Sequence, residues 1–180
     1  MKNRFFLMLF ICSALSFLSC SNDDSSDSVD GIVTAKINGQ TWRSTTLESA
    51  TLLQVGNEGQ RFDIIANNDQ YRFTLSIEQA DIDECMINTS YEIPNGIFVF
   101  YIREGNFDYP LTVDVFNETV QNNLLINITG CSNGKMTGTF SGTLYRETYD
   151  DTIDDYVVEN FEITEGSFTN IPFTTTTINP

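Results

Sequence analysis

The sequence predicts an all-β fold: a single antiparallel β-sandwich or flattened barrel of about ten strands. Hydrophobic residues make up 41% of the 180 residues, with 14 Phe and 7 Tyr, so a substantial core can form in one domain. Short apolar or alternating segments recur along the chain, and turn residues separate nearly all of them. No segment has the pattern of a long amphipathic helix. These three observations together favour many short strands over a mixed or helical fold.

The first predicted element is a hairpin. Residues 32–37 lead into Asn38-Gly39 and then into residues 40–45, and an Asn-Gly pair between two strand-like segments is a strong hairpin signal. Residues 47–55 come next and fit either a strand or a short helix.

Two later segments show which face or layer they occupy. From Tyr71 to Glu78 apolar and polar residues alternate, which predicts a strand with one wet face. Ile97 to Ile102 is apolar on both faces and is expected near the centre of a sheet.

The tail 174–180 has no following partner, so we expect it either to fray or to join a sheet edge. The other expected strands are residues 61–66, 90–93, 96–103, 111–116, 120–129, 135–146, 156–164 and 166–173.

Two glycines share the inner face of the strand expected at 135–146. Gly138 and Gly142 alternate there with Met136, Phe140 and Leu144. Glycine inside a strand usually marks a bend, a bulge or the close approach of another group. We therefore interpret both glycines as residues of the fold, with a small internal cavity as the alternative.

The amino terminus has the layout of a secretory signal peptide over residues 1–19. Lys2 and Arg4 precede the apolar run Phe5–Leu18, which is shorter than the roughly 20 residues that a membrane-spanning helix needs. Phe17–Cys20 resembles a lipobox, in which Cys20 is lipidated and becomes the new amino terminus. The alternative is an ordinary signal peptide that is cut elsewhere.

Residues 20–30 follow as an acidic, Ser/Asp-rich tether that we expect to be disordered. A serine and acidic cluster directly after a lipidated cysteine looks like the signal that exports lipoproteins of the Bacteroidetes to the outer face of the outer membrane. A plain solvated linker is the alternative. The residues from 31 to 173 would then form the β domain.

Charge limits the partners. The net charge is 9 − 25 = −16, and it becomes 7 − 25 = −18 once Lys2 and Arg4 are removed with the signal peptide. Nucleic acid would be repelled, and membrane attachment is expected through acyl chains alone. The sequence has no histidine, which removes Ser-His-Asp and Cys-His catalysis and the usual zinc ligand sets.

Two of the four cysteines belong to the predicted β domain. Cys12 is lost with the signal peptide and Cys20 carries the lipid, which leaves Cys85 and Cys131. A single pair in an oxidising compartment predicts one disulfide. Two buried free thiols are the alternative.

Three stretches resemble a family of surface lipoproteins of the Bacteroidetes, a domain of unknown function. They are AKINGQTW at 35–42, NLLINITG with KMTGTFSGTL within 123–144, and EITEGSFTNIPF at 162–173. The resemblance implies an exported, lipid-anchored β-domain. It carries over no functional residues.

One acidic loop is a candidate metal site. Asp150, Asp151, Asp154 and Asp155 lie within eight residues, and calcium is bound by six to eight oxygen ligands. The spacing differs from the EF-hand loop and no glycine supplies its sharp turn, so a solvated acidic loop is the favoured interpretation and no cofactor is otherwise expected.

Exposed aromatic residues are the other candidates for binding. Trp42 is expected in the core or at its edge, whereas Phe107 and Tyr109, in a segment expected to be a loop, could form a surface platform. We therefore expect a non-catalytic binding or structural module with a glycan, peptide or protein ligand. The alternative is a hydrolase that acts on glycans through two carboxylates, although nothing in the sequence selects a pair.

Overall fold

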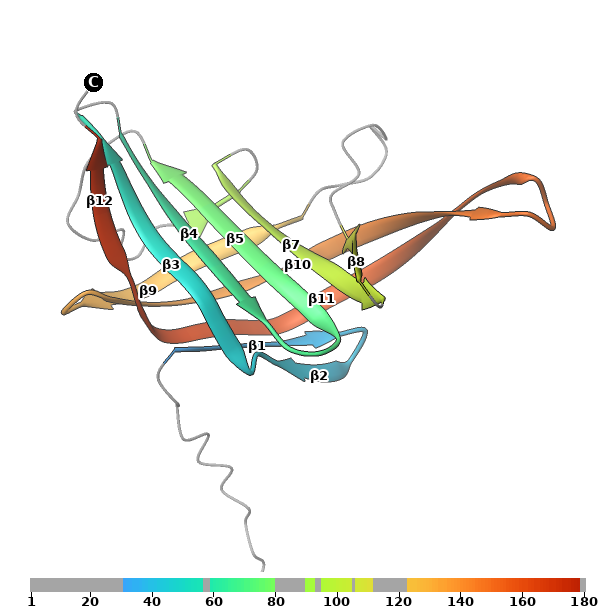
Figure 1. Ribbon diagram of the computed structural model, residues 1–180, viewed down its shortest axis with the longest axis horizontal. Coiled ribbons are helices and arrows are strands. Elements are labelled where there is room, and N and C mark those ends of the chain that lie inside the picture. The colour runs from blue at the N-terminus through green and yellow to red at the C-terminus, as the bar shows by residue number, and fades with distance from the viewer. Residues whose placement is uncertain are drawn as a thin grey trace, which may run out of the picture.

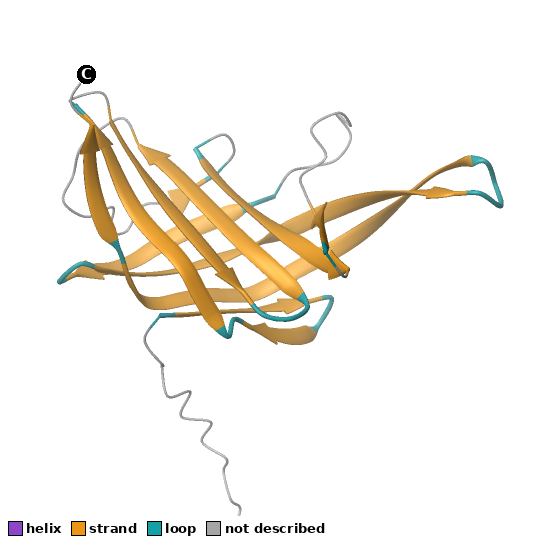
Figure 2. Cartoon of the chain, viewed as in Figure 1, coloured by secondary structure: helices purple, strands orange, loops and turns teal. Residues whose placement is uncertain are grey.

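The computed structural model shows two β-sheets of six strands each, packed face to face, with their strands running in different directions (Figures 1 and 2). The sheets do not close into a barrel over the described part of the chain, so of the two predicted forms the sandwich is the one observed. The structure describes residues 31–56, 59–79, 90–92, 95–104, 106–111 and 123–178.

The first sheet, sheet A, has the order β2-β1-β11-β10-β9-β6. Its strands are β2 (Gln40–Arg43), β1 (Ile32–Ile37), β11 (Asp155–Pro172), β10 (Lys135–Asp150), β9 (Leu125–Ser132) and β6 (Ser90–Tyr91). The second sheet, sheet B, has the order β12-β3-β4-β5-β7-β8. Its strands are β12 (Thr174–Ile178), β3 (Thr46–Val55), β4 (Gly59–Asn67), β5 (Tyr71–Gln79), β7 (Gly96–Glu104) and β8 (Phe107–Leu111).

The predicted opening hairpin is confirmed as β1 and β2. Asn38 and Gly39 have φ values of 49° and 78°, as a two-residue type I′ turn requires. The segment that fitted a strand or a helix is strand β3. β7 lies between β5 and β8, one strand in from the edge, so it is paired on both sides but does not lie at the centre of the sheet, where its apolar sequence predicted it.

Two expectations are wrong, and a third that the sequence left open is decided. Residues 107–110 are predicted to be a loop, but together with Leu111 they form edge strand β8, because they pair with the end of β7. The strands expected at 156–164 and 166–173 are one strand, β11, which bulges at Glu165 with φ of 50° and continues through Gly166. The tail joins an edge as β12, and its pairing with β3 is parallel whereas every other described pair is antiparallel.

Some predicted strands cannot be compared with the structure. Of the strand expected at 111–116 only Leu111 is described, and residues 112–122 lie outside the described part of the chain. The strand expected at 120–129 is described from residue 123, where β9 begins at Leu125.

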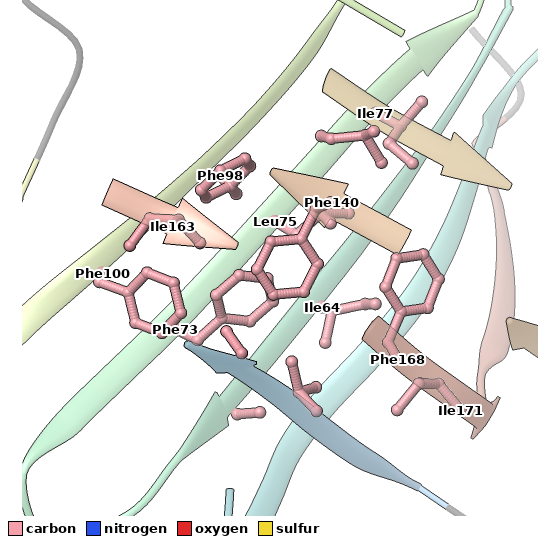
Figure 3. Packing of buried hydrophobic residues seen from close by; sticks show 14 of the residues in the cluster. Ile64, Phe73, Leu75, Ile77, Phe98, Phe100, Phe140, Ile163, Phe168 and Ile171 are labelled. Carbon is pink, nitrogen blue, oxygen red and sulfur yellow. The ribbon is translucent and has the colours of Figure 1, made fainter. Parts of the chain in front are cut away.

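Aromatic rings from both sheets form the centre of the core (Figure 3). Phe140 of sheet A stacks on Phe73 of sheet B with ring centroids 4.8 Å apart, and it lies 5.0 Å from Phe98. Trp42 is 3% exposed and meets Phe100 edge-on at 4.9 Å, which confirms its predicted place in the core. The large rings pack here as closely as molecules in an organic crystal, so a substitution that changes the volume of a core side chain should destabilise the domain.

The glycines of β10 leave room for neighbouring groups of the same sheet to lie close against the strand. A Cβ built on Gly138 would lie 2.3 Å from the Phe168 ring, and one on Gly142 would lie 2.5 Å from the side chain of Leu124. The interpretation of both as fold residues is therefore confirmed by the close approach that each one permits.

Candidate functional site

The most distinctive surface of the protein is a projecting hairpin, visible at the right of Figure 1 as the orange ends of β10 and β11. The two strands pair from Lys135↔Pro172 to Asp150↔Asp155. The buried core ends at Leu144 on β10 and resumes at Ile163 on β11. Residues 147–159, which we call the arm, therefore extend beyond the core, and all but the half-buried Asp150 are exposed.

Large apolar side chains gather on the arm. Ile153 is 61% exposed and Tyr156 is 64% exposed, and Tyr149, Val157 and Val158 are also exposed. These five account for most of the eight exposed large hydrophobic residues in the described chain. Scattered single residues of this kind need no explanation, but a cluster on one element indicates an interaction site.

The pleat divides the arm into two faces. On the outer face, Tyr149 pairs with Tyr156 across the strands, and their rings meet edge-on at 5.2 Å. On the inner face, Thr148 pairs with Val157. The inner face continues the side of β10 that carries Leu144 into the core, because successive side chains alternate between faces.

The tip is held by its own carboxylates. The Asp150 carboxylate accepts hydrogen bonds from the Thr152 backbone N–H at 2.8 Å and from the Thr152 hydroxyl. The Tyr149 hydroxyl donates to Asp154, which has a left-handed φ of 55°. Asp155 accepts from the Tyr156 N–H at 2.8 Å. Asp and Asn favour turns for this reason.

These hydrogen bonds change two ionisation equilibria. The hydrogen bonds from the Thr152 hydroxyl and backbone stabilise the charged form and lower the pKa of Asp150. The hydrogen bond to Asp154 raises the pKa of Tyr149 above its usual 10.0, because loss of the phenol proton would place two negative charges together.

The arrangement does not converge on a cation. Across the residues that the structure describes, no group of three or more Asp, Glu, Cys or His side chains is placed to hold a metal ion. Asp150, Asp154 and Asp155 instead bond to three different groups around the turn. The calcium alternative for Asp150, Asp151, Asp154 and Asp155 thus has no support from this geometry.

The predicted aromatic platform lies near the base of the arm, on β8. Phe107 is 68% exposed and Tyr109 is 41% exposed. The Arg146 guanidinium lies 5.4 Å from the centroid of the Tyr109 ring and 3.5 Å from Glu104. One of the two platform residues therefore already holds a cation of the chain itself.

A shallow depression of ≈ 440 Å³ lies on the arm. Its lining residues are Thr148, Tyr149, Thr152 and Val157 together with the acidic Asp150, Asp151 and Glu159. A depression of ≈ 470 Å³ also lies over the outer face of sheet B, but there Arg61 and Asp63 satisfy each other at 2.8 Å.

The structure describes only one of the three remaining predicted site residues, the cysteines Cys20, Cys85 and Cys131. Cys20 and Cys85 lie outside the described residues. Cys131 is half-buried in β9 and packs against the core. Lipidation at Cys20 and the pairing of Cys85 with Cys131 therefore stay predictions.

Sequence reasoning missed the arm. It ended one strand at Arg146 and began the next at Tyr156, and it treated the residues between them as a loop. A usable signal was present, because Thr148 and Tyr149 on one side and Val157 and Val158 on the other are strand-favouring residues around a short Asp-rich turn.

Fold and site together define an all-β sandwich domain with a projecting, apolar and acidic hairpin. No protein-family model, curated protein or solved structure matches the chain. The resemblance to surface lipoproteins of the Bacteroidetes therefore stays a prediction from the sequence. The described residues contain no helix that is long and apolar enough to cross a membrane.

Proposed function

We propose that this chain is a lipoprotein of the outer membrane, anchored through Cys20 and facing the cell exterior, which acts as a non-catalytic binding module. Its binding element is the arm. The observation that carries the proposal is the cluster of exposed tyrosine and valine side chains on residues 147–159, far from the point where the chain enters the domain.

The direction of β11 supports this function. The Gly31 N–H donates to the Thr169 carbonyl at 3.0 Å, so the chain enters the domain beside the carboxyl-terminal end of β11. The other end of β11, at Asp155, belongs to the arm tip, and 169 − 155 = 14 residues separate the two points. At a rise of about 3.3 Å per residue, that distance is about 45 Å. A tether that ends at Gly31 would let the arm point away from an anchoring membrane.

The arm is also built to be presented instead of buried. Its strands have no neighbour beyond each other over residues 147–158, in the part of the chain that the structure describes. A lone two-stranded ribbon has little hydrophobic stabilisation of its own. Here the body holds the base of the ribbon, while the Tyr149–Tyr156 contact and the turn hydrogen bonds hold its end.

Anchoring and display are tested together. Mass spectrometry of the mature amino terminus should find a lipid-modified Cys20, and Cys20→Ser should release the protein from membranes. Protease added to intact cells should digest the domain. An unmodified terminus, or a domain that survives the protease, would overturn this part of the proposal.

Binding through the arm is tested by site-specific photocrosslinking on intact cells. A photoreactive phenylalanine at Tyr156 should form adducts, whereas the same group at Thr74, on the outer face of sheet B, should form few. Equal adduct yields at both positions would contradict the assignment of the arm. The rival function is hydrolysis of glycans, and turnover of a bound sugar that is lost on changing one carboxylate would replace the proposal.

A further inference from the structure

The inner face of the arm has the features of a binding site for a cationic side chain. We propose that its depression binds a lysine or arginine side chain from a basic segment of a partner protein. This inference rests on the proposed function, because it names the chemistry of the partner that the arm contacts.

The lining of the depression matches a long basic side chain. Val157 and the methyl group of Thr148 offer apolar surface, and Asp150, Asp151 and Glu159 offer carboxylates. Lysine and arginine cover apolar surface with their methylene stems while their charged ends stay at the polar rim. A charge-assisted hydrogen bond to a carboxylate is stronger than a neutral one.

The negative charge of the arm favours a basic ligand. The arm contains six acidic residues, and no lysine or arginine follows Arg146 anywhere in the sequence. Several carboxylates on the body have cations beside them, such as Glu165 with Lys36 at 2.6 Å and Glu48 with Arg72 at 3.2 Å. None of the ion pairs found among the described residues includes a carboxylate of the arm.

The chain already holds one arginine in the same way at the base of the arm. Arg146 lies over the Tyr109 ring at 5.4 Å and is 3.5 Å from Glu104. Binding of a second copy of this chain would bring an acidic arm against another acidic surface, and repulsion between like charges opposes this contact. A neutral glycan would use the tyrosines but would leave the carboxylates unexplained.

The test is fluorescence anisotropy with the purified full chain at low ionic strength, where surface electrostatics are least screened. The probe is a labelled octapeptide in which arginine alternates with serine or leucine. The same peptide with citrulline in place of arginine keeps the shape and removes the charge. The arginine peptide should bind, and the citrulline peptide should not.

Matched variants separate the depression from general attraction to an acidic protein. Asp151→Asn with Glu159→Gln should raise Kd about fivefold, as expected for the loss of two exposed ion pairs. Glu92→Gln with Glu162→Gln removes the same charge from exposed positions on the body and should raise Kd less than about twofold. Val157→Ser leaves the charge unchanged and should raise Kd about threefold, because it removes apolar contact with the stem.

Several results would overturn the inference. Equal weakening by the two double variants would show diffuse attraction, and no effect of Val157→Ser would remove the stem contact. Binding to a neutral glycan array but not to the arginine peptide would replace the partner class while the proposed binding function stands. Failure of the proposed function shows elsewhere, as an unmodified Cys20 or equal crosslinking at Tyr156 and Thr74.

Discussion

Adding one methyl group at Gly138 should destabilise the whole domain. The new Cβ would lie 2.3 Å from Cζ of Phe168 and 2.5 Å from the backbone oxygen of Asn127. Real Cβ atoms do not approach so closely, so the ring or strand β9 must move. Phe168 is fully buried, and a neighbouring strand cannot shift alone, which leaves little room for relief.

Overpacking of this kind costs about 1–3 kcal/mol. Because side chain and backbone are both contacted, we expect Gly138→Ala to lose about 3 kcal/mol of unfolding free energy, at the upper end of that range. For a domain of this size the loss lowers Tm by about 6–12 °C.

Gly130→Ala is the matched control. Gly130 lies on the neighbouring strand β9, where a Cβ would meet Thr137 at an ordinary 3.6 Å. Removing a glycine there reduces the entropy of the unfolded chain, so Tm should stay the same or rise slightly. Circular dichroism melts and urea titrations of both variants measure the difference. The packing argument would be refuted if Gly138→Ala melted at the same temperature as the wild type, or if Gly130→Ala lost as much stability as Gly138→Ala.

Four other predictions follow from the structure. Trp42→Ala should cost about 3–5 kcal/mol in urea titrations, because Trp42 packs against Phe100, and a loss under about 1 kcal/mol would contradict its place in the core. In an NMR titration the pKa of the Tyr149 phenol should lie above its usual value. The hydrogen bond from Tyr149 to Asp154 therefore stabilises the arm at neutral pH, and this stabilisation is lost as pH rises through the raised pKa. Asp154→Asn should bring the pKa of Tyr149 back down. The pKa of Asp150 is lowered, so its support for the turn is lost only as pH falls through that lowered value, and amide exchange at Thr152 that stays unchanged in acid would contradict this. Millimolar calcium should shift Tm no more than sodium chloride of equal ionic strength, and a calcium-specific shift that Asp154→Asn removes would restore the metal site.

Local chemistry was sufficient to predict several features of this protein. Asn38-Gly39 between two strands strongly favours a two-residue hairpin turn. The alternation from Tyr71 to Glu78 gives that strand one apolar face wherever it is placed in a sheet. Trp42 is too large and apolar to remain outside in a protein with a core available. Each of these follows from the preferences of a few neighbouring residues, so no knowledge of the partner strands was needed.

The features that sequence reasoning missed are those that depend on a partner distant in the chain. Residues 107–110 resemble a loop until β7 supplies their hydrogen bonds, and Gly166 resembles a break until β10 and β1 hold β11 together on both sides. The threonine-rich tail could fray or pair, and β3 decides that it pairs.

The arm shows the same division most clearly. The sequence by itself determined that strand-favouring residues flank an acidic turn, because propensity is a local property. Only the tertiary structure decided that the other strands of the sheet end before Glu147 and Glu159, so that the hairpin continues into solvent. A pattern of period two shows which side chains share a face, but only the neighbouring elements determine whether that face is covered.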